Sequence, residues 1–382
     1  MTTENTHKVP NVPPLRFPEF SGEWERKRIR ELFAINVGGD IDKKDVNPIC
    51  TEHFKYPIIA NALSNDGIYG YTSVYKDKAP CITVTGRGDI GKAKYRDTPL
   101  YPIVRLLVLH SLGDVDCLFG EYAINHIRIY EESTGVPQLT APQLGAYHIK
   151  YPSSEEQMKI GAFLSLLDKR ISTQNKIIQH LESLITGITQ SVRDNATQKV
   201  LLRDVLTEKD EKNIGNHDVY SVSVSEGVIN QIDYLGRSFA AKETRNYNVV
   251  QYGDIVYTKS PTGSFPYGIV KQSYIKEKAA VSPLYGVYKP VSFEVGYYLH
   301  HYFTSPIYTT NYLHKLIQKG AKNTINITNQ RFLENYIPLP NPEVLEKYVA
   351  LVSAVTTKLE NEKQVLNKLK EQKNYLLSQM FI

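Results

Sequence analysis

The sequence is poor in cysteine and has no long apolar run. Its three cysteines, Cys50, Cys81 and Cys117, are far apart and form no C-x-x-C pair, which excludes a disulfide scaffold and argues against a cysteine metal site. The best apolar stretch, Ile103–Leu109, is interrupted by Arg105, whereas a membrane-spanning helix needs about 20 apolar residues. The polar N-terminus (MTTENTHKVP) lacks the apolar core of a signal peptide. We therefore expect a cytoplasmic protein with no membrane partner and no metal site.

An excess of charge of one sign is also lacking. The 45 Lys and Arg residues against 40 Asp and Glu leave a formal net charge of +5, which permits an acidic partner without requiring one. The length of 382 residues suggests two or three domains. One count is high, because 27 Tyr stand against 12 Phe and one Trp. Tyr combines apolar area with a hydrogen-bonding tip, so it suits both half-buried sheets and wet interfaces.

Catalytic motifs are absent or incomplete. Gly86–Gly91 (GRGDIG) with Lys92 is close to a phosphate loop, but Ala93 stands where that loop needs a Mg²⁺-binding hydroxyl. The residues that follow it indicate turns on the way to a strand, whereas such a loop must open a helix. We interpret it as a glycine-rich connection between strands that exposes Arg87 and Lys92. No N-P-P-[YF], G-x-S-x-G or H-E-x-x-H motif occurs, so we expect no catalytic residue.

An internal duplication organises the chain. A shift of 188 positions places Ile149 on Ile337 and Pro152 on Pro340, and a shift of 173 places 29–32 (IREL) on 202–205 (LRDV). The first shift also superposes two series of residues spaced 4-3-4-3, which is a heptad seam typical of long supercoiled helices. The first series is Ile160, Leu164, Leu167, Ile171, Gln174, Ile178, Leu181, Ile185, Ile188 and Val192. The second is Tyr348, Val352, Val355, Leu359, Glu362, Leu366, Leu369, Lys373, Leu376 and Met380.

The two copies predict the order of the domains. Ser153 and the Asn341-Pro342 pair are helix-start signals in front of the two seams. The first helix leads out of one block and the second must lead back to share its seam, so we expect an antiparallel coiled coil. The predicted class is α+β, with two mixed α/β domains joined by two long helices. The alternative is two unrelated core helices. The expected segments are a lead-in at 1–32, a domain at 33–152, a helix at 153–198, a domain at 199–340 and a helix at 341–382.

These features resemble the specificity subunits of type I restriction-modification enzymes. Leu15–Trp24 (LRFPEFSGEW) resembles the N-terminal signature of that family. Tyr151–Asp168 (YPSSEEQMKIGAFLSLLD) resembles its proline–Glu-Gln helix start and first conserved helix, and Ser378–Ile382 (SQMFI) its common C-terminal ending. Pro340–Lys347 (PNPEVLEK) departs from the pattern, because the second copy lacks the Glu-Gln pair.

The resemblance implies a function. Each domain would be a target recognition domain that reads half of a bipartite site in double-stranded DNA. The paired helices would set the spacing of the half-sites and dock two adenine-methyltransferase (modification) subunits, and restriction subunits would add translocation and cleavage. The chain itself would be non-catalytic, with S-adenosylmethionine, ATP and Mg²⁺ bound by the partner subunits. Two alternatives remain open: a scaffold or adaptor protein that binds no DNA, and the specificity subunit of a type IIB-like system.

Polar loops at equivalent places in the two domains supply the candidate DNA contacts. Arg, Lys, Asn and Gln are the side chains that read base edges and bind phosphates. The first domain carries such loops at 86–92 and 135–143, and the second at 259–267 and 319–329. The candidates are Arg87, Lys92, Gln138, Thr140 and Gln143 in the first domain, and Lys259, Ser260, Thr262, Lys322, Asn323 and Asn326 in the second.

Overall fold

The computed structural model describes residues 11–129, 137–237, 243–319 and 325–382. The chain divides into two compact units. Unit 1 comprises Met1–Asn175 and Gln364–Ile382, and unit 2 comprises Lys176–Lys363. Each unit therefore contains a β-rich domain and one half of each of two long helices, α4 (Ser154–Asp194) and α9 (Pro342–Met380).

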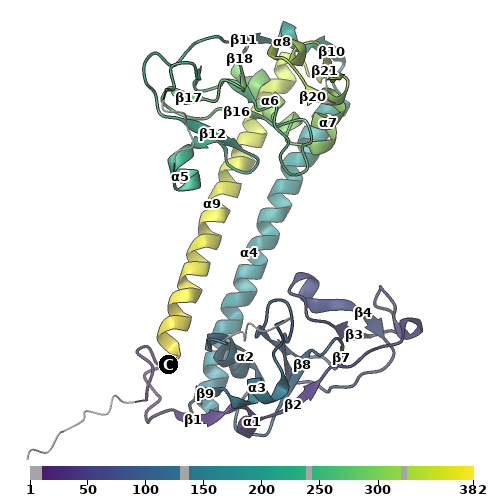
Figure 1. The fold of residues 1–382 in the computed structure, drawn as a ribbon, viewed down its shortest axis with the longest axis vertical. Coiled ribbons are helices and arrows are strands. Elements are labelled where there is room, and N and C mark those ends of the chain that lie inside the picture. The colour runs from purple at the N-terminus through teal and green to yellow at the C-terminus, as the bar shows by residue number, and fades with distance from the viewer. Residues whose placement is uncertain (1–10, 130–136, 238–242, 320–324) are drawn as a thin grey trace, which may run out of the picture. The chain divides into compact units, whose positions relative to one another are not determined.

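Within each unit, the two long helices drawn in Figure 1 pack together through residues of the predicted seam. In unit 1 the start of α4 meets the end of α9, where Ile160 and Leu164 share a core with Leu376 and Met380. In unit 2 the end of α4 meets the start of α9, where Tyr348 and Val352 are buried against the residues Ile185, Ile188 and Val192. The helices are thus antiparallel within each unit, and every seam residue is buried or half-buried. The predicted α+β fold with two paired long helices is confirmed.

Unit 1 is built on a four-stranded antiparallel sheet of order β2-β8-β5-β6, with helix α2 packed against it. The strands of a second, three-stranded sheet of order β4-β3-β7 come from the part of the chain between β2 and β8. A two-stranded ribbon, β1–β9, connects the domain to α4. The elements are β1 (Glu25–Arg28), α1 (Ile29–Leu32), β2 (Phe33–Val37), η1 (Lys43–Asp45), β3 (Tyr56–Ile59), η2 (Ser64–Gly67), β4 (Ile68–Thr72), β5 (Cys81–Val84), β6 (Ala93–Arg96), β7 (Tyr101–Pro102), β8 (Leu107–Ser111), α2 (Cys117–His126), α3 (Ala141–Ala146) and β9 (His148–Tyr151).

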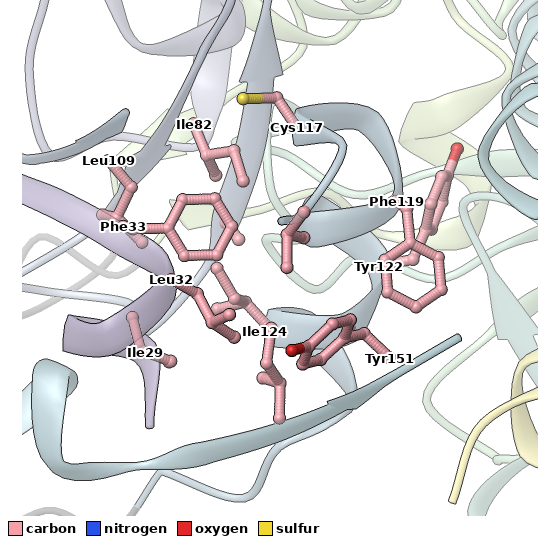
Figure 2. Close-up of a cluster of buried hydrophobic side chains, with 14 of the residues drawn as sticks. Ile29, Leu32, Phe33, Ile82, Leu109, Cys117, Phe119, Tyr122, Ile124 and Tyr151 are labelled. Atoms are coloured by element: carbon pink, nitrogen blue, oxygen red, sulfur yellow. The ribbon is translucent and has the colours of Figure 1, made fainter. Parts of the chain in front are cut away.

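The core of unit 1 lies between this sheet and α2. Figure 2 shows Phe33, Ile82 and Leu109 of the sheet together with Phe119 of α2. Gly120 allows the close approach, because a Cβ there would lie 2.8 Å from Ile82 Cδ1 and 3.0 Å from Phe33 Cζ. A larger residue at this position would force the side chain of Ile82 or Phe33 to shift.

Unit 2 repeats the plan with a sheet of order β11-β18-β15-β16, again antiparallel, and the ribbon β10–β21. Helix α6 takes the place of α2, and α8 the place of α3. The elements are β10 (Gln198–Leu201), η3 (Leu202–Asp204), β11 (Leu206–Glu208), β12 (Tyr220–Ser223), β13 (Gly227–Asn230), α5 (Gln231–Leu235), β14 (Asn248–Val250), β15 (Ile255–Tyr257), β16 (Val270–Gln272), β17 (Ala279–Val281), β18 (Gly286–Pro290), α6 (Phe293–Tyr302), α7 (Pro306–His314), β19 (Gln318–Lys319), β20 (Ile325–Asn326), α8 (Asn329–Phe332) and β21 (Tyr336–Leu339).

The strand registers confirm the internal duplication. In the ribbon of unit 1, Lys27 pairs with Ile149, and in that of unit 2, Val200 pairs with Ile337. Lys27 and Val200 differ by 173 positions, and Ile149 and Ile337 differ by 188. One strand of the ribbon therefore follows the first shift found in the sequence, and its partner strand follows the second. The duplication is therefore one of structure as well as of sequence.

The core of unit 2 is rich in tyrosine. Tyr257, Tyr288, Tyr298, Tyr312 and Tyr348 are at most 3% exposed. Four of their hydroxyls donate to backbone carbonyls 2.6–3.0 Å away, those of Tyr267, Asn329, Pro338 and Phe332. The hydroxyl of Tyr348 lies 2.9 Å from that of Thr189 in α4. These phenols fill the core and at once satisfy carbonyls of α8, of β21 and of the loop residue Tyr267, so packing in unit 2 accounts for part of the tyrosine count.

Candidate DNA interface

Two of the predicted loops are the same hairpin in the two units. Residues 85–92 join β5 to β6, and residues 258–269 join β15 to β16. The flanking registers correspond, since Ile82 pairs with Tyr95 and Ile255 with Gln272. The GRGDIG run leads into a strand, so its interpretation as a connection between strands is confirmed. We call these segments hairpin 1 (85–92) and hairpin 2 (258–269).

Hairpin 1 contacts the second predicted loop of its unit. Arg87 Nη2 donates to Gln138 Oε1 at 3.0 Å, and Leu139 N donates to Gly86 O at 2.9 Å. Asn61 holds the hairpin from the other side, because its Oδ1 accepts from Gly86 N at 2.7 Å. Arg87 is half-buried and Lys92 is exposed. The structure therefore joins Arg87 and Gln138 in one site and adds Asn61, which no sequence spacing indicated.

Thr140 and Gln143 act locally as a helix cap. Thr140 Oγ1 donates to Gln143 Oε1 at 2.8 Å, Thr140 N donates to the same oxygen at 2.9 Å, and Thr140 Oγ1 accepts from Gln143 N at 3.4 Å. This is a capping box at the start of α3. Thr328, 188 positions later, caps α8 with one such bond, because its Oγ1 accepts from Arg331 N at 3.2 Å. Capping accounts for the recurrence of these polar residues, and a DNA contact by them stays a prediction.

The candidates of unit 2 are only partly described. Lys259 is half-buried in a left-handed conformation (φ 62°), and burial lowers the pKa of its ammonium group. Ser260 and Thr262 are exposed at the tip of hairpin 2. Lys322 and Asn323 lie outside the described residues. Asn326 belongs to β20, whose backbone pairs with β19, and its role stays a prediction.

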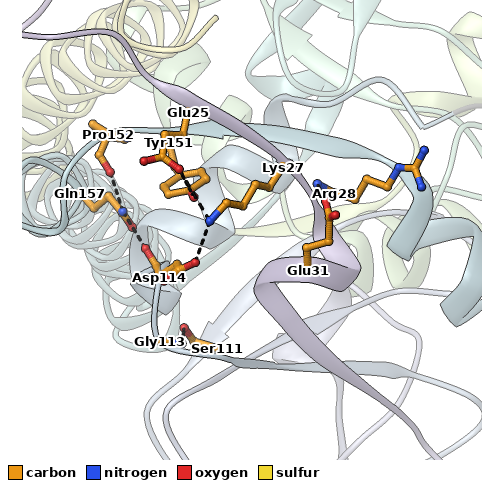
Figure 3. A network of polar contacts seen from close by, with 10 residues as sticks. All are labelled: Glu25, Lys27, Arg28, Glu31, Ser111, Gly113, Asp114, Tyr151, Pro152 and Gln157. Atoms are coloured by element: carbon orange, nitrogen blue, oxygen red, sulfur yellow. Dashed lines mark hydrogen bonds and ion pairs between the residues drawn. The ribbon is translucent and has the colours of Figure 1, made fainter.

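The Glu-Gln pair at the start of α4 has a structural role. The side chain of Glu156 is fully buried and accepts from Arg16 Nε at 2.7 Å and from Arg16 Nη2 at 2.6 Å. Gln157 Nε2 donates to the carbonyls of Pro152 and Asp114 at 2.9 and 3.0 Å (Figure 3). The pair thus holds the N-terminal segment and the β8–α2 loop against the helix. Val344 and Leu345 stand at the corresponding positions of α9, and Leu345 is buried in the core of unit 2.

The described part of the chain contains no group of three or more His, Cys, Asp and Glu side chains that could hold a metal ion. None of its helices combines the length and the apolar character needed to cross a membrane.

The sequence matches a known family. A model of the type I restriction modification DNA specificity domain matches residues 21–183. The type I specificity subunit S.MpnORF507P of Mycoplasma pneumoniae is 31% identical over 146 residues, which are 38% of this chain and 40% of that protein. The C-terminus of the type I specificity subunit S.MpnORF289P of the same organism is 32% identical over 97 residues, which are 25% of this chain and 67% of that C-terminal protein. The chain thus spans about two fifths of the first relative and two thirds of the second.

The fold has a counterpart among solved structures. The S subunit of a type I restriction-modification system from M. genitalium superposes with a TM-score of 0.66 at 16% identity, over 97% of this chain and 99% of that one. The likeness covers both β-rich domains and both long helices. The chain belongs to the family of type I restriction-modification DNA specificity subunits.

Proposed function

We propose that this chain selects the DNA site of a type I restriction-modification complex, with each unit reading one half of a bipartite sequence. The observation that carries the proposal is the repeated hairpin. Hairpins 1 and 2 occupy the same place in two copies of one fold, yet their sequences, GRGDIG and SPTGSFPY, differ completely. Two equivalent scaffolds with unlike polar loops suit the reading of two unlike half-sites.

The long helices would set the spacing of the half-sites and dock two modification subunits. Phe163 and Leu351 lie at corresponding positions of the two helices and are 38% and 51% exposed. Exposed apolar residues at equivalent positions of two copies suit two identical partners. The chain would be the non-catalytic subunit of a cytoplasmic complex, with S-adenosylmethionine, ATP and Mg²⁺ held by modification and restriction subunits. A type IIB-like assembly would use the same DNA contacts with different partners.

Deleting the gene tests the proposal. We expect one bipartite methyladenine motif to disappear from the genome and to return on complementation. Complementation with a chain whose residues 33–152 come from another specificity subunit should change one half-site and leave the other intact. Long-read methylome sequencing measures both results. An unchanged methylome after deletion would contradict the proposed function. A change in both half-sites after the exchange of residues 33–152 would contradict the proposal that each unit reads one half-site.

Substitutions in hairpin 1 test the candidate site. Arg87→Ala should cost about 1–3 kcal/mol of binding and relax preference at one base pair of one half-site, as expected for a base contact. Lys92→Ala should weaken binding to all sequences alike, because an exposed lysine suits a phosphate. Binding of duplexes with single changes in the motif measures both effects. Lys43→Ala is the matched control, since Lys43 is an exposed lysine of unit 1 outside the hairpin. Equal effects of all three substitutions would contradict this assignment.

A further inference from the structure

One face of the ribbon in unit 1 carries only basic side chains. The antiparallel register of β1 and β9 places Arg26 opposite Lys150 and Arg28 opposite His148. Because side chains alternate along a strand, these four lie on one face of the ribbon. Figure 3 shows the alternation, with Lys27 directed toward Tyr151 and Asp114 and the side chain of Arg28 directed away. Like charges directly opposite each other destabilise a strand pair.

This basic face borders a cavity of about 500 Å³ within unit 1. Arg26, His148 and Lys150 of the ribbon line it together with His126 and Arg128, which lie at and beyond the end of α2. Ala123, Ile127, Ala146, Tyr147, Ile149, Phe381 and Ile382 complete the lining, and the carboxylate of Ile382, the last residue of the sequence, is its one acidic group. Among the described residues, the side chains of Arg26, Arg128 and Lys150 form no ion pair or hydrogen bond. Apolar walls strengthen the field of such charges, so the cavity favours an anion.

The duplication provides an internal control. The positions of unit 2 that correspond to the four basic residues of the ribbon are Lys199, Leu201, Tyr336 and Pro338. Both ribbons pair the same two segments of the repeat, yet only one of them is basic. The fold therefore does not require the basic face, and its like-charge pair is better explained by a ligand.

The structure connects this face to hairpin 1. Asn125, near the end of α2, accepts from Ala93 N and donates to Ala93 O, both at 2.9 Å, at the base of the hairpin. Gly91 of the hairpin lies against Ile129, since a Cβ at Gly91 would come 2.6 Å from Ile129 Cδ1. The end of α2 therefore lines the cavity and supports the hairpin at once, and DNA held by the hairpin would have backbone phosphates nearby.

We propose that the face formed by Arg26, His148, Lys150 and Arg128 binds backbone phosphates of the DNA that unit 1 reads. The inference rests on the proposed function. The face would add affinity without sequence information, because phosphate contacts position a protein on the duplex and base contacts specify the sequence. Unit 2 has no equivalent, so the two halves of the chain would grip DNA unequally.

The test measures DNA binding by the full chain with its co-purifying subunits over a series of salt concentrations. The probes are a duplex that carries the methylated motif and a scrambled duplex. The double variant Arg26→Gln/Lys150→Gln should weaken binding to both duplexes by the same factor. It should also reduce the slope of log K against log salt by about 2, since each neutralised phosphate contributes about 0.9. Lys199→Gln in unit 2 is the matched control and should leave both quantities unchanged.

Folding and function are separated by two further results. The variant should melt at the wild-type temperature or above it, because it removes a like-charge pair. Unchanged affinity and slope would overturn the inference, and so would a loss confined to the motif duplex. Loss of a co-purifying subunit with normal DNA binding would assign the face to an acidic protein surface instead, which also overturns it. If the wild-type complex binds neither duplex, the proposed function itself fails.

Discussion

Arg16→Ala is expected to destabilise unit 1 by about 3–5 kcal/mol. The substitution removes both charge-assisted hydrogen bonds from Glu156, whose side chain is fully buried. A buried carboxylate without its partner keeps the cost of desolvation and loses the compensating attraction. Arg16 also donates to the carbonyl of Gly22 at 2.6 Å, so the N-terminal segment loses its anchor as well. Urea unfolding of the full chain measures the change in free energy.

Two variants make this experiment decisive. Glu156→Gln combined with Arg16→Ala should recover part of the loss, because the buried charge is then gone. Lys159→Ala is the matched control, since Lys159 pairs with Glu19 where both side chains are almost half exposed. An exposed pair contributes less than about 1 kcal/mol. Similar losses for Arg16→Ala and Lys159→Ala would contradict the buried role of Glu156.

Unit 2 is expected to unfold steeply above about pH 10. Burial raises the pKa of Tyr257, Tyr288, Tyr298, Tyr312 and Tyr348 above the ordinary value of 10.0. Below pH 10 both states are protonated and the stability is complete. Above it the unfolded phenols lose protons that the folded ones keep, so stability falls as pH rises. Each phenol lowers the free energy of unfolding by about 1.4 kcal/mol per pH unit, so the five together lower it by about 7 kcal/mol per pH unit.

Denaturant unfolding at a series of alkaline pH values, followed with tyrosinate absorbance, measures this slope. Tyr348→Phe should reduce the slope by about 1.4 kcal/mol per pH unit, although it also removes one hydrogen bond worth about 1 kcal/mol. Tyr375→Phe is the control, because Tyr375 is 62% exposed and should leave the slope unchanged. A slope that does not respond to Tyr348→Phe would mean that this phenol ionises without unfolding.

The order of domains and long helices could be predicted because the sequence contains two copies of the same arrangement. The 188-position shift superposes two heptad seams, and the burial of their residues follows from the helical period. The 173-position shift then identifies β1 with β10. The two shifts equate Lys27 with Val200 and Ile149 with Ile337, and the structure pairs Lys27 with Ile149 and Val200 with Ile337. Repetition thus shows that the two ribbons correspond, but only the structure shows which strands pair.

The candidate site was only partly predictable for a physical reason. Polarity and loop position identify Arg87 and Gln138, but their hydrogen bond joins residues 51 positions apart, which no local pattern encodes. Thr140 and Gln143 are polar and in the right loop, yet they satisfy the first turn of α3. A polar side chain in a loop can face a ligand or cap a helix, and the composition is the same in both cases.

By itself, the sequence determined the properties that depend on near neighbours and on repetition. These are the seam, the helix starts, the duplicated plan, the unlike hairpins and the absence of familiar catalytic motifs. Tertiary structure alone decided which polar groups meet across the chain. It buried Glu156 against Arg16, directed the hydroxyl of Tyr288 to the carbonyl of Asn329 in α8, and placed Arg26 opposite Lys150 beside a cavity. The reason is that burial and electrostatic pairing depend on distances in space, and segments far apart in the chain set those distances only when it folds.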